Sequence, residues 1–146
     1  MTRKRKISAF YLIYLKKWHN HIFHCILNIG LEAGDFMNLI TFDSITDEIT
    51  EMTKKETLVW IKSVLERYIE IYTSDMHTYV NYIDLCIDSK VSVGEARKKA
   101  FEIHSKARNS KAMNEKNLYR AIAHGIATYH VKEHALKSMY YLKKIK

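Results

Sequence analysis

The segment 117–142, NLYRAIAHGIATYHVKEHALKSMYYL, decides the fold that we predict for this chain. It contains no proline, and Ala121 and Gly125 lie four positions apart within a run of small residues. Residues four apart share one face of a helix, so this spacing leaves a stripe without bulky side chains, where a second helix can come close. The segment predicts a central packing helix, or two helices broken near His130 and Val131, with any partner-binding surface elsewhere.

The composition of the whole chain favours helices. The 146 residues include no proline and four glycines, so few residues interrupt a helix. Hydrophobic residues make up 47% and charged residues 27%, which are ordinary values for a globular protein. We therefore expect an all-α fold in which residues 1–146 form one domain, a bundle of about five or more helices around a single core.

Start signals mark several of the expected helices. Thr53–Glu56 and Ser92–Glu95 are capping boxes, Ser74–Asp75 offers another cap, and Asn114 is the predicted cap of the last helix. Apolar residues then recur every three or four positions, as on the buried face of a helix. The predicted core positions are Leu58, Ile61, Val64, Leu65, Tyr68, Ile69, Tyr72, Tyr79, Ile83, Cys86, Ile87, Ala96, Ala100, Ile103, His104 and Ala107.

The first 54 residues are less regular. Residues 6–28 predict a helix, and 35–53 predict a helix–loop insert in which Asp43 caps a brief helix. No apolar run approaches the roughly 18 residues that span a membrane. Cys25 and Cys86 form no CxxC motif, which indicates two reduced thiols. We expect a soluble, cytoplasmic protein.

The charge is distributed unevenly along the chain. The net charge is +8, but residues 1–24 sum to +6, residues 25–95 to −8 and residues 96–146 to +10. Such asymmetry indicates a nucleic-acid face, an acidic protein partner, or compensation of charge within the fold.

Two stretches near the end resemble a known family. VSVGEARKKAFEIHSKAR at 91–108 and YRAIAHGIATYHVKEHALKSMYYLKK at 119–144 resemble the immunity-five-like group of bacterial putative immunity proteins from polymorphic toxin systems. The similar region is 55–146, and 1–54 has no counterpart. The pair His124–Gly125 reverses the family's usual order, so His124 is left out of the matched set. The motif residues carried over, with a structural role, are Glu95, Arg97, His104, Arg108, Arg120, His130 and His134.

The resemblance implies a helical protein that binds and neutralises a cognate bacterial toxin, with no catalytic residues and no cofactor. The chain contains neither a phosphate-binding glycine loop nor a Gly-x-Ser-x-Gly motif, which agrees with a protein that is not an enzyme. The positive net charge predicts an acidic patch on the toxin and disfavours a basic nuclease as the target. A homo-oligomer is compatible with the sequence.

A metal site is the first alternative. His130 and His134 lie four apart, the spacing that presents two imidazoles on one helical face, and His104 could add a third ligand. The motif is HVKEH rather than HExxH, however, and a single pair at this spacing often arises by chance. We expect no bound metal, and we expect these histidines to hydrogen-bond to neighbouring helices, with Glu95 or Glu102 as partners.

A nucleic-acid-binding protein is the second alternative. Lys143, Lys144 and Lys146 with residues 3–6 could neutralise phosphates, and Tyr140 or Tyr141 could stack on bases. No known nucleic-acid-binding motif is present, and Met139, Tyr140 and Leu142 also fit a core stripe, so this function is disfavoured.

The arginines allow two interpretations. Arg97, Arg108 and Arg120 could present a basic surface to an acidic partner. The favoured interpretation is that they pair with carboxylates of the acidic middle, which are those of Asp75, Asp84 and Asp88.

Overall fold

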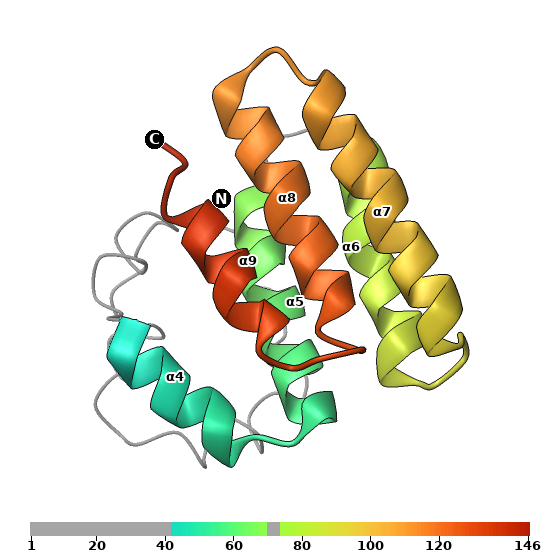
Figure 1. Ribbon diagram of the computed structural model, residues 1–146, viewed down its shortest axis with the longest axis vertical. Helices are drawn as coiled ribbons and strands as arrows, with labels where there is room; N and C mark the ends of the chain where they lie inside the picture. Colours follow the sequence, from blue (N-terminus) through green and yellow to red (C-terminus); the bar gives the residue numbers. More distant parts are fainter. Residues whose placement is uncertain (1–41, 70–73) are drawn as a thin grey trace, which may run out of the picture.

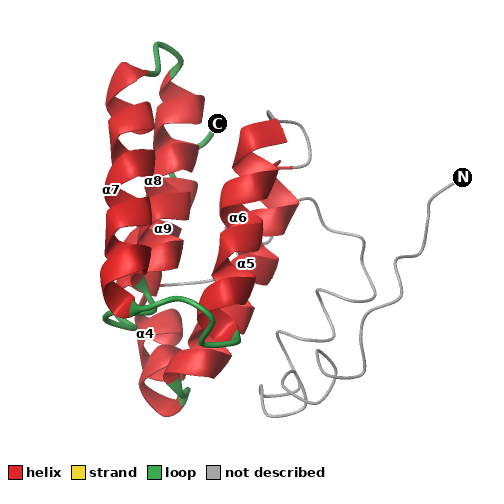
Figure 2. Ribbon diagram, turned by 90° about the vertical axis from the view of Figure 1, so that its right-hand side faces the viewer, coloured by secondary structure: helices red, strands yellow, loops and turns green. Residues whose placement is uncertain are grey.

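The computed structural model describes residues 42–69 and 74–146, which form six α-helices and no strand. The helices are α4 (Phe42–Glu51), α5 (Lys54–Ile69), α6 (Ser74–Ile87), α7 (Val93–Asn109), α8 (Met113–Ala127) and α9 (His134–Leu142). In Figure 2, α7, α8 and α9 form one layer, α5 and α6 form a second, and α4 lies at one end. The predicted all-α fold is confirmed, while the expected helix 6–28 and Cys25 lie outside the described residues. None of the described helices is long and apolar enough to cross a membrane.

Helix α8 lies at the centre of the molecule. It packs against α5, α6, α7 and α9, and Figure 1 shows it between α7 and α9 in the front layer. The helix ends at Ala127, and the amides of His130 and Val131 both donate to the Ala127 carbonyl oxygen, at 2.9 and 3.1 Å. These turn bonds reverse the chain before α9 begins at His134. The predicted pair of helices broken near His130 and Val131 is therefore confirmed.

Both capping boxes form. The Thr53 amide donates to Glu56 Oε2 at 2.8 Å and the Glu56 amide to Thr53 Oγ1 at 3.1 Å. The corresponding distances in the Ser92 box are 2.6 and 3.1 Å, and these bonds lower the pKa of Glu95. Each box satisfies two amides that the first helical turn leaves without partners.

Two other predicted caps are wrong. Helix α8 starts from Ala112, and Asn114 instead holds Lys146, donating to its carbonyl oxygen at 3.0 Å and accepting from its amide at 3.2 Å. Helix α4 already begins at Phe42, so Asp43 lies inside the helix and not before it.

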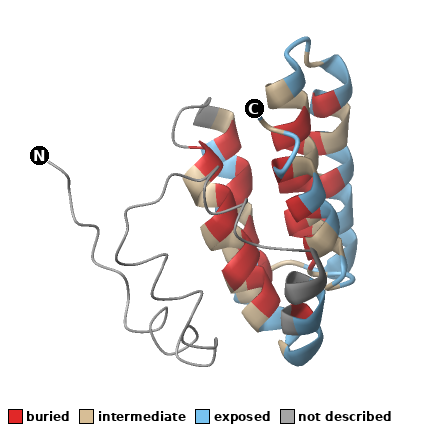
Figure 3. Cartoon of the chain, turned by 90° about the vertical axis from the view of Figure 1, so that its left-hand side faces the viewer, coloured by how far each residue is buried: buried red, intermediate tan, exposed pale blue. Residues whose placement is uncertain are grey.

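The core lies between the two layers of helices. Buried residues line the facing sides, as Figure 3 shows, and the predicted core positions in α5 and α7 are buried except for half-buried His104. Tyr72 lies outside the described residues. The largest fully buried side chains are Leu58, Ile61, Leu65, Met76, Ile83, Ile103, Leu118, Ile122, Ile126, Met139 and Leu142.

The predicted core stripe in α9 is right for two of its three members. Met139 and Leu142 are fully buried, whereas Tyr140 is 47% exposed. Tyr140 follows Met139 directly, so it points about 100° away from it around the helix and reaches solvent. Its side chain is therefore available on the surface.

Gly125 allows the central helix to approach the second layer. A Cβ atom at this position would lie 2.7 Å from Leu65 Cδ1 and 3.5 Å from Ile83 Cδ1. The first distance is well inside van der Waals contact, and Leu65 and Ile83 are both fully buried in the core. At Gly125, the small-residue stripe predicted from the sequence thus contacts the α5–α6 layer.

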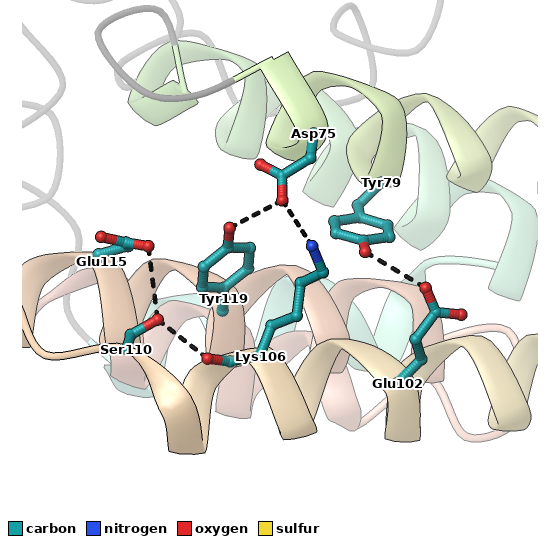
Figure 4. A network of polar contacts seen from close by, with 7 residues as sticks. All are labelled: Asp75, Tyr79, Glu102, Lys106, Ser110, Glu115 and Tyr119. Atoms are coloured by element: carbon teal, nitrogen blue, oxygen red, sulfur yellow. Dashed lines mark hydrogen bonds and ion pairs between the residues drawn. The ribbon is translucent and has the colours of Figure 1, made fainter.

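A polar network fixes α7 against its neighbours (Figure 4). Asp75 Oδ2 in α6 accepts from Lys106 Nζ in α7 and from the Tyr119 hydroxyl in α8, each at 2.9 Å. One turn along, the Tyr79 hydroxyl donates to Glu102 Oε1 at 3.2 Å. These bonds join three helices, and the bond to Asp75 raises the pKa of Lys106.

The expected pairing of arginines with the acidic middle is wrong. Asp75 pairs with Lys106, Asp84 with Lys62 at 2.9 Å, and Asp88 with Lys90 at 3.8 Å. Within 42–69 and 74–146 no carboxylate forms an ion pair with an arginine of α7 or α8. Lysines therefore supply the compensation of charge that was assigned to arginines, and the arginines stay available.

Helix α6 ends in a Schellman motif. The Lys90 amide donates to the Leu85 carbonyl oxygen at 2.8 Å, the Ser89 amide donates to that of Cys86 at 3.1 Å, and Ser89 has φ 55°. This left-handed conformation suits glycine because a Cβ atom crowds the backbone there.

We predict that Gly125→Val destabilises the protein by about 2–3 kcal/mol, because the added atoms overpack a closed core. Gly94→Ala is the control, because its Cβ atom would meet only Ser92 Oγ, at 3.8 Å. Alanine favours a helix more than glycine does, so the free energy of unfolding should rise by roughly a few tenths of a kcal/mol. Urea unfolding followed by circular dichroism measures both. Equal effects of the two substitutions would contradict the close approach.

We also predict that Ser89→Gly raises the free energy of unfolding by about 1 kcal/mol, since glycine adopts the left-handed conformation without strain. Ser89→Ala keeps the Cβ atom and should change stability little. Thermal unfolding of the two variants provides the measurement. A stabilisation by alanine equal to that by glycine would show that the serine side chain, and not the backbone angle, is responsible.

Candidate functional site

Four rings from three helices form a cluster on the layer of α7, α8 and α9. His104 from α7 meets His124 from α8 edge to face, with ring centroids 5.0 Å apart. His124 stacks on Tyr141 of α9 at 5.5 Å with 7° between the planes, and on His134 of α9 at 5.4 Å. We call His104, His124, His134 and Tyr141 the ring cluster, and His124 is its centre.

A hydrogen bond joins two of the imidazoles. The Nδ1 atoms of His124 and His134 lie 3.2 Å apart, so one ring donates its N–H and the other accepts. The accepting ring must therefore be neutral. The bond ties the end of α8 to the start of α9 across the turn between them.

Burial and neighbouring positive charge keep the cluster neutral. Desolvation is the largest cause that lowers the pKa of His124, to about 3, and the nearby His104, His134 and Lys137 add to it. The pKa of His104 is lowered by desolvation and then by Arg108 and Arg120, and that of His134 by desolvation and Lys137. Near pH 7 the protein therefore presents neutral imidazoles surrounded by cations.

The predicted histidine set does not come together as a ligand set. His130 is exposed and its ring centroid lies 6.5 Å from that of His134, while His104 contacts His124 instead. In the described part of the chain, no group of three or more His, Cys, Asp or Glu side chains is placed to hold a metal ion. Of the three histidines expected to hydrogen-bond to a neighbouring helix, His134 does so, with His124 of α8 as its partner.

The predicted partners of the histidines, however, are wrong. Glu95 is part of its capping box, and Glu102 accepts from Tyr79 and Lys99 on the side of α7 that faces α6. His104 lies two positions from Glu102 and therefore on a different side of the helix.

The central residue of the cluster is the histidine that family matching left out. His124 lies 20 positions from His104 and 17 from Tyr141, so no local spacing connects the three rings. The sequence did contain one indication that His124 belongs to this site: it lies four positions after Arg120, on the same face of the predicted helix. Only the antiparallel packing of α7, α8 and α9 brings their rings together.

Cations lie over the aromatic rings at the edge of the cluster. The guanidinium carbon of Arg120 lies 5.6 Å from the Tyr141 ring centroid, and Lys144 Nζ lies 4.2 Å from that of Tyr140 and 5.5 Å from that of Tyr141. Such contacts hold flexible cationic side chains close to the surface. Arg97 and Arg108, the other predicted arginines, are exposed on α7.

The cluster lacks the arrangement needed for nucleophilic catalysis. In residues 42–69 and 74–146, no hydrogen bond joins its imidazoles to a hydroxyl, thiol or carboxylate that could act as nucleophile or orienting group. Cys86 is buried in the core as a free thiol, and desolvation raises its pKa to about 11.

A model of a known protein family matches most of the described chain. The family is described as Imm-5 like putative immunity protein, and the match covers residues 47–146. It therefore runs from within α4 to the end of α9 and includes the whole ring cluster. Comparison with curated proteins and with solved structures gives no match.

We predict that acid destabilises the protein through the ring cluster. Because the pKa values of His104, His124 and His134 are lower in the folded chain than in the unfolded chain, the unfolded state binds more protons below about pH 6.5. The free energy of unfolding should fall by about 1 kcal/mol between pH 7.5 and 5, after allowance for solvent screening of half-buried rings.

Thermal unfolding across this pH range tests the prediction. His124→Gln should flatten the dependence of Tm on pH, whereas His77→Gln, at an exposed position of α6, should leave it unchanged. An unaltered slope in His124→Gln would contradict the assignment. Carboxylates titrate mainly below pH 5, so they contribute little in this window.

Proposed function

The chain belongs to the family of Imm-5 like putative immunity proteins, and we propose that it binds a cognate bacterial toxin and neutralises it without a chemical step of its own. The observation that carries the proposal is the family match over residues 47–146, which spans the whole described bundle apart from the first turns of α4. Neutralisation by binding needs only a stable surface that covers the active surface of the toxin.

Two features of the structure support binding rather than chemistry. The ring cluster contains neutral imidazoles without a hydrogen-bonded nucleophile, and the arginines of α7 and α8 have no carboxylate partner among the described residues. Arginine and tyrosine side chains are enriched at the energetic centres of protein interfaces. We expect this cytoplasmic protein to meet its toxin through such anchors.

Nucleic-acid binding receives less support from the geometry. Tyr141 already stacks on His124 at 5.5 Å, and Lys144 lies 4.2 Å from the centroid of the Tyr140 ring. A base could stack on Tyr141 only after one of its present partners moved.

Co-expression tests the proposed function. The domain to use is the C-terminal domain of a large secreted protein encoded beside the gene for this chain. We predict that cells expressing this domain grow only when the chain is co-expressed, and that the two proteins copurify as a complex. Gly125→Val, which should impair folding, is expected to protect poorly, whereas Gly94→Ala should protect fully.

A non-cognate toxin domain serves as the control for specificity, since an immunity protein should not protect against it. Absence of both protection and a complex with the cognate domain would refute the proposal. Protection without a complex would also refute it, because neutralisation would then not depend on binding.

A further inference from the structure

We propose that the outer surface of α7, α8 and α9 around the ring cluster is the toxin-binding surface, and that it recognises an acidic patch of the toxin through arginine, lysine and tyrosine side chains. This inference rests on the proposed function. We define the basic-aromatic face by Arg108, Arg120, Lys137, Tyr140, Tyr141 and Lys144. Four of these six residues lie in the segment 117–142, which the sequence assigned to packing alone.

The face is continuous across three helices. Arg108 and Arg120, from α7 and α8, both lie close enough to His104 to lower its pKa, and Lys137 of α9 acts in the same way on His124 and His134. In α9, Lys137 and Tyr141 lie four positions apart and share one side of the helix. Lys144 follows the end of α9, and its Nζ lies 5.5 Å from the centroid of the Tyr141 ring. The cations therefore surround the ring cluster rather than scatter over the molecule.

The face carries an excess of positive charge that the fold does not use. Residues 103–146 include ten lysines and arginines but only two glutamates, Glu115 and Glu133. Within the residues that the structure describes, Arg108, Arg120, Lys137 and Lys144 form no ion pair with a carboxylate. Like charges gathered without counter-charges repel one another and destabilise a folded chain. A partner that supplies carboxylates would therefore reduce this repulsion.

The side of α7 that faces α6 has the opposite arrangement. There Lys106 pairs with Asp75, and Lys99 pairs with Glu102 at 2.8 Å. Lys99 and Lys106 are thus paired with carboxylates on this side, whereas Arg108 pairs with no carboxylate of the described residues. Arg108 bonds only to the Ser105 hydroxyl, at 2.6 Å, among the described residues, which leaves guanidinium N–H groups for a carboxylate.

Aromatic side chains complete the composition expected of an interface. Tyr140 is 47% exposed and Phe101 is 65% exposed, and Phe101 lies on α7 one turn before His104. Exposed aromatic rings beside arginines are typical of interface hot spots, because they bury much apolar area at a small entropic cost. The contacts of Arg120 and Lys144 with the tyrosine rings also restrict these cations before binding.

The test uses a charge-reversal variant and a matched control. R108E/K137E reverses two exposed cations of the face, one on each side of the ring cluster. K90E/K98E reverses two exposed lysines elsewhere. Lys90 lies in the turn after α6, and Lys98 lies on α7 one turn before Glu102, on the side of α7 that faces α6. Both variants change the net charge equally. Circular dichroism and Tm show that each has folded.

Affinity is measured by calorimetry with the purified cognate toxin domain named above. We expect R108E/K137E to bind at least about 100-fold more weakly than the wild type and to lose protection, and K90E/K98E to stay within about threefold. Tyr140→Ala, which changes no charge, should weaken binding about tenfold.

Three results would overturn either the proposed function or the assignment of the basic-aromatic face. A wild-type chain that does not bind the toxin domain refutes the proposed function itself. If the wild type binds and R108E/K137E binds as tightly as K90E/K98E, the function stands and the assignment of the face is wrong. The face is also wrongly assigned to a protein partner if R108E/K137E binds toxin normally but loses binding to a labelled single-stranded oligonucleotide.

Discussion

The absence of a side chain at Gly125 is the constraint on which the rest of the structure depends. Because a Cβ atom there would lie 2.7 Å from a methyl group of Leu65, a larger residue would require the buried Leu65 side chain to move or α8 to lie farther from the second layer. With α8 held in the centre, α7 and α9 pack on either side of it. This position is also what brings rings from three helices into contact around His124.

The molecule separates structural charges from unpaired ones. Between α6, α7 and α8, Asp75 accepts from both Lys106 and Tyr119, so carboxylates of the acidic middle meet lysines of the basic end inside the fold. On the opposite side of α7, the imidazoles stay neutral because burial removes them from water, and because protonation would add charge beside Arg108, Arg120 and Lys137. The histidines are thus uncharged and half-buried, and they lie beside cations that are available to a partner.

Such a surface suits a protein that works by binding. Cations at the edge of an interface mainly accelerate the encounter with an acidic partner, whereas buried arginine and tyrosine anchors slow its release. Membership of the Imm-5 like family supplies the class of partner, and the basic-aromatic face supplies the chemistry by which we propose that it is recognised. The packing role of the segment 117–142 and its proposed binding role use different sides of the same two helices.

Local patterns in the sequence determined helices α5 to α9, the two capping boxes and most of the core, because these depend on neighbours three or four positions away. The break between α8 and α9 and the need for small residues near Gly125 were visible for the same reason. The family was visible only through the resemblance of residues 91–108 and 119–144 to its motifs. Which charges would pair, and that His124 would join His104 to Tyr141, was decided only by the tertiary structure. The contacts of His124 with Tyr141 and His104 and of Asp75 with Lys106 join residues 17, 20 and 31 positions apart, and their partners are chosen by how the helices are oriented against one another.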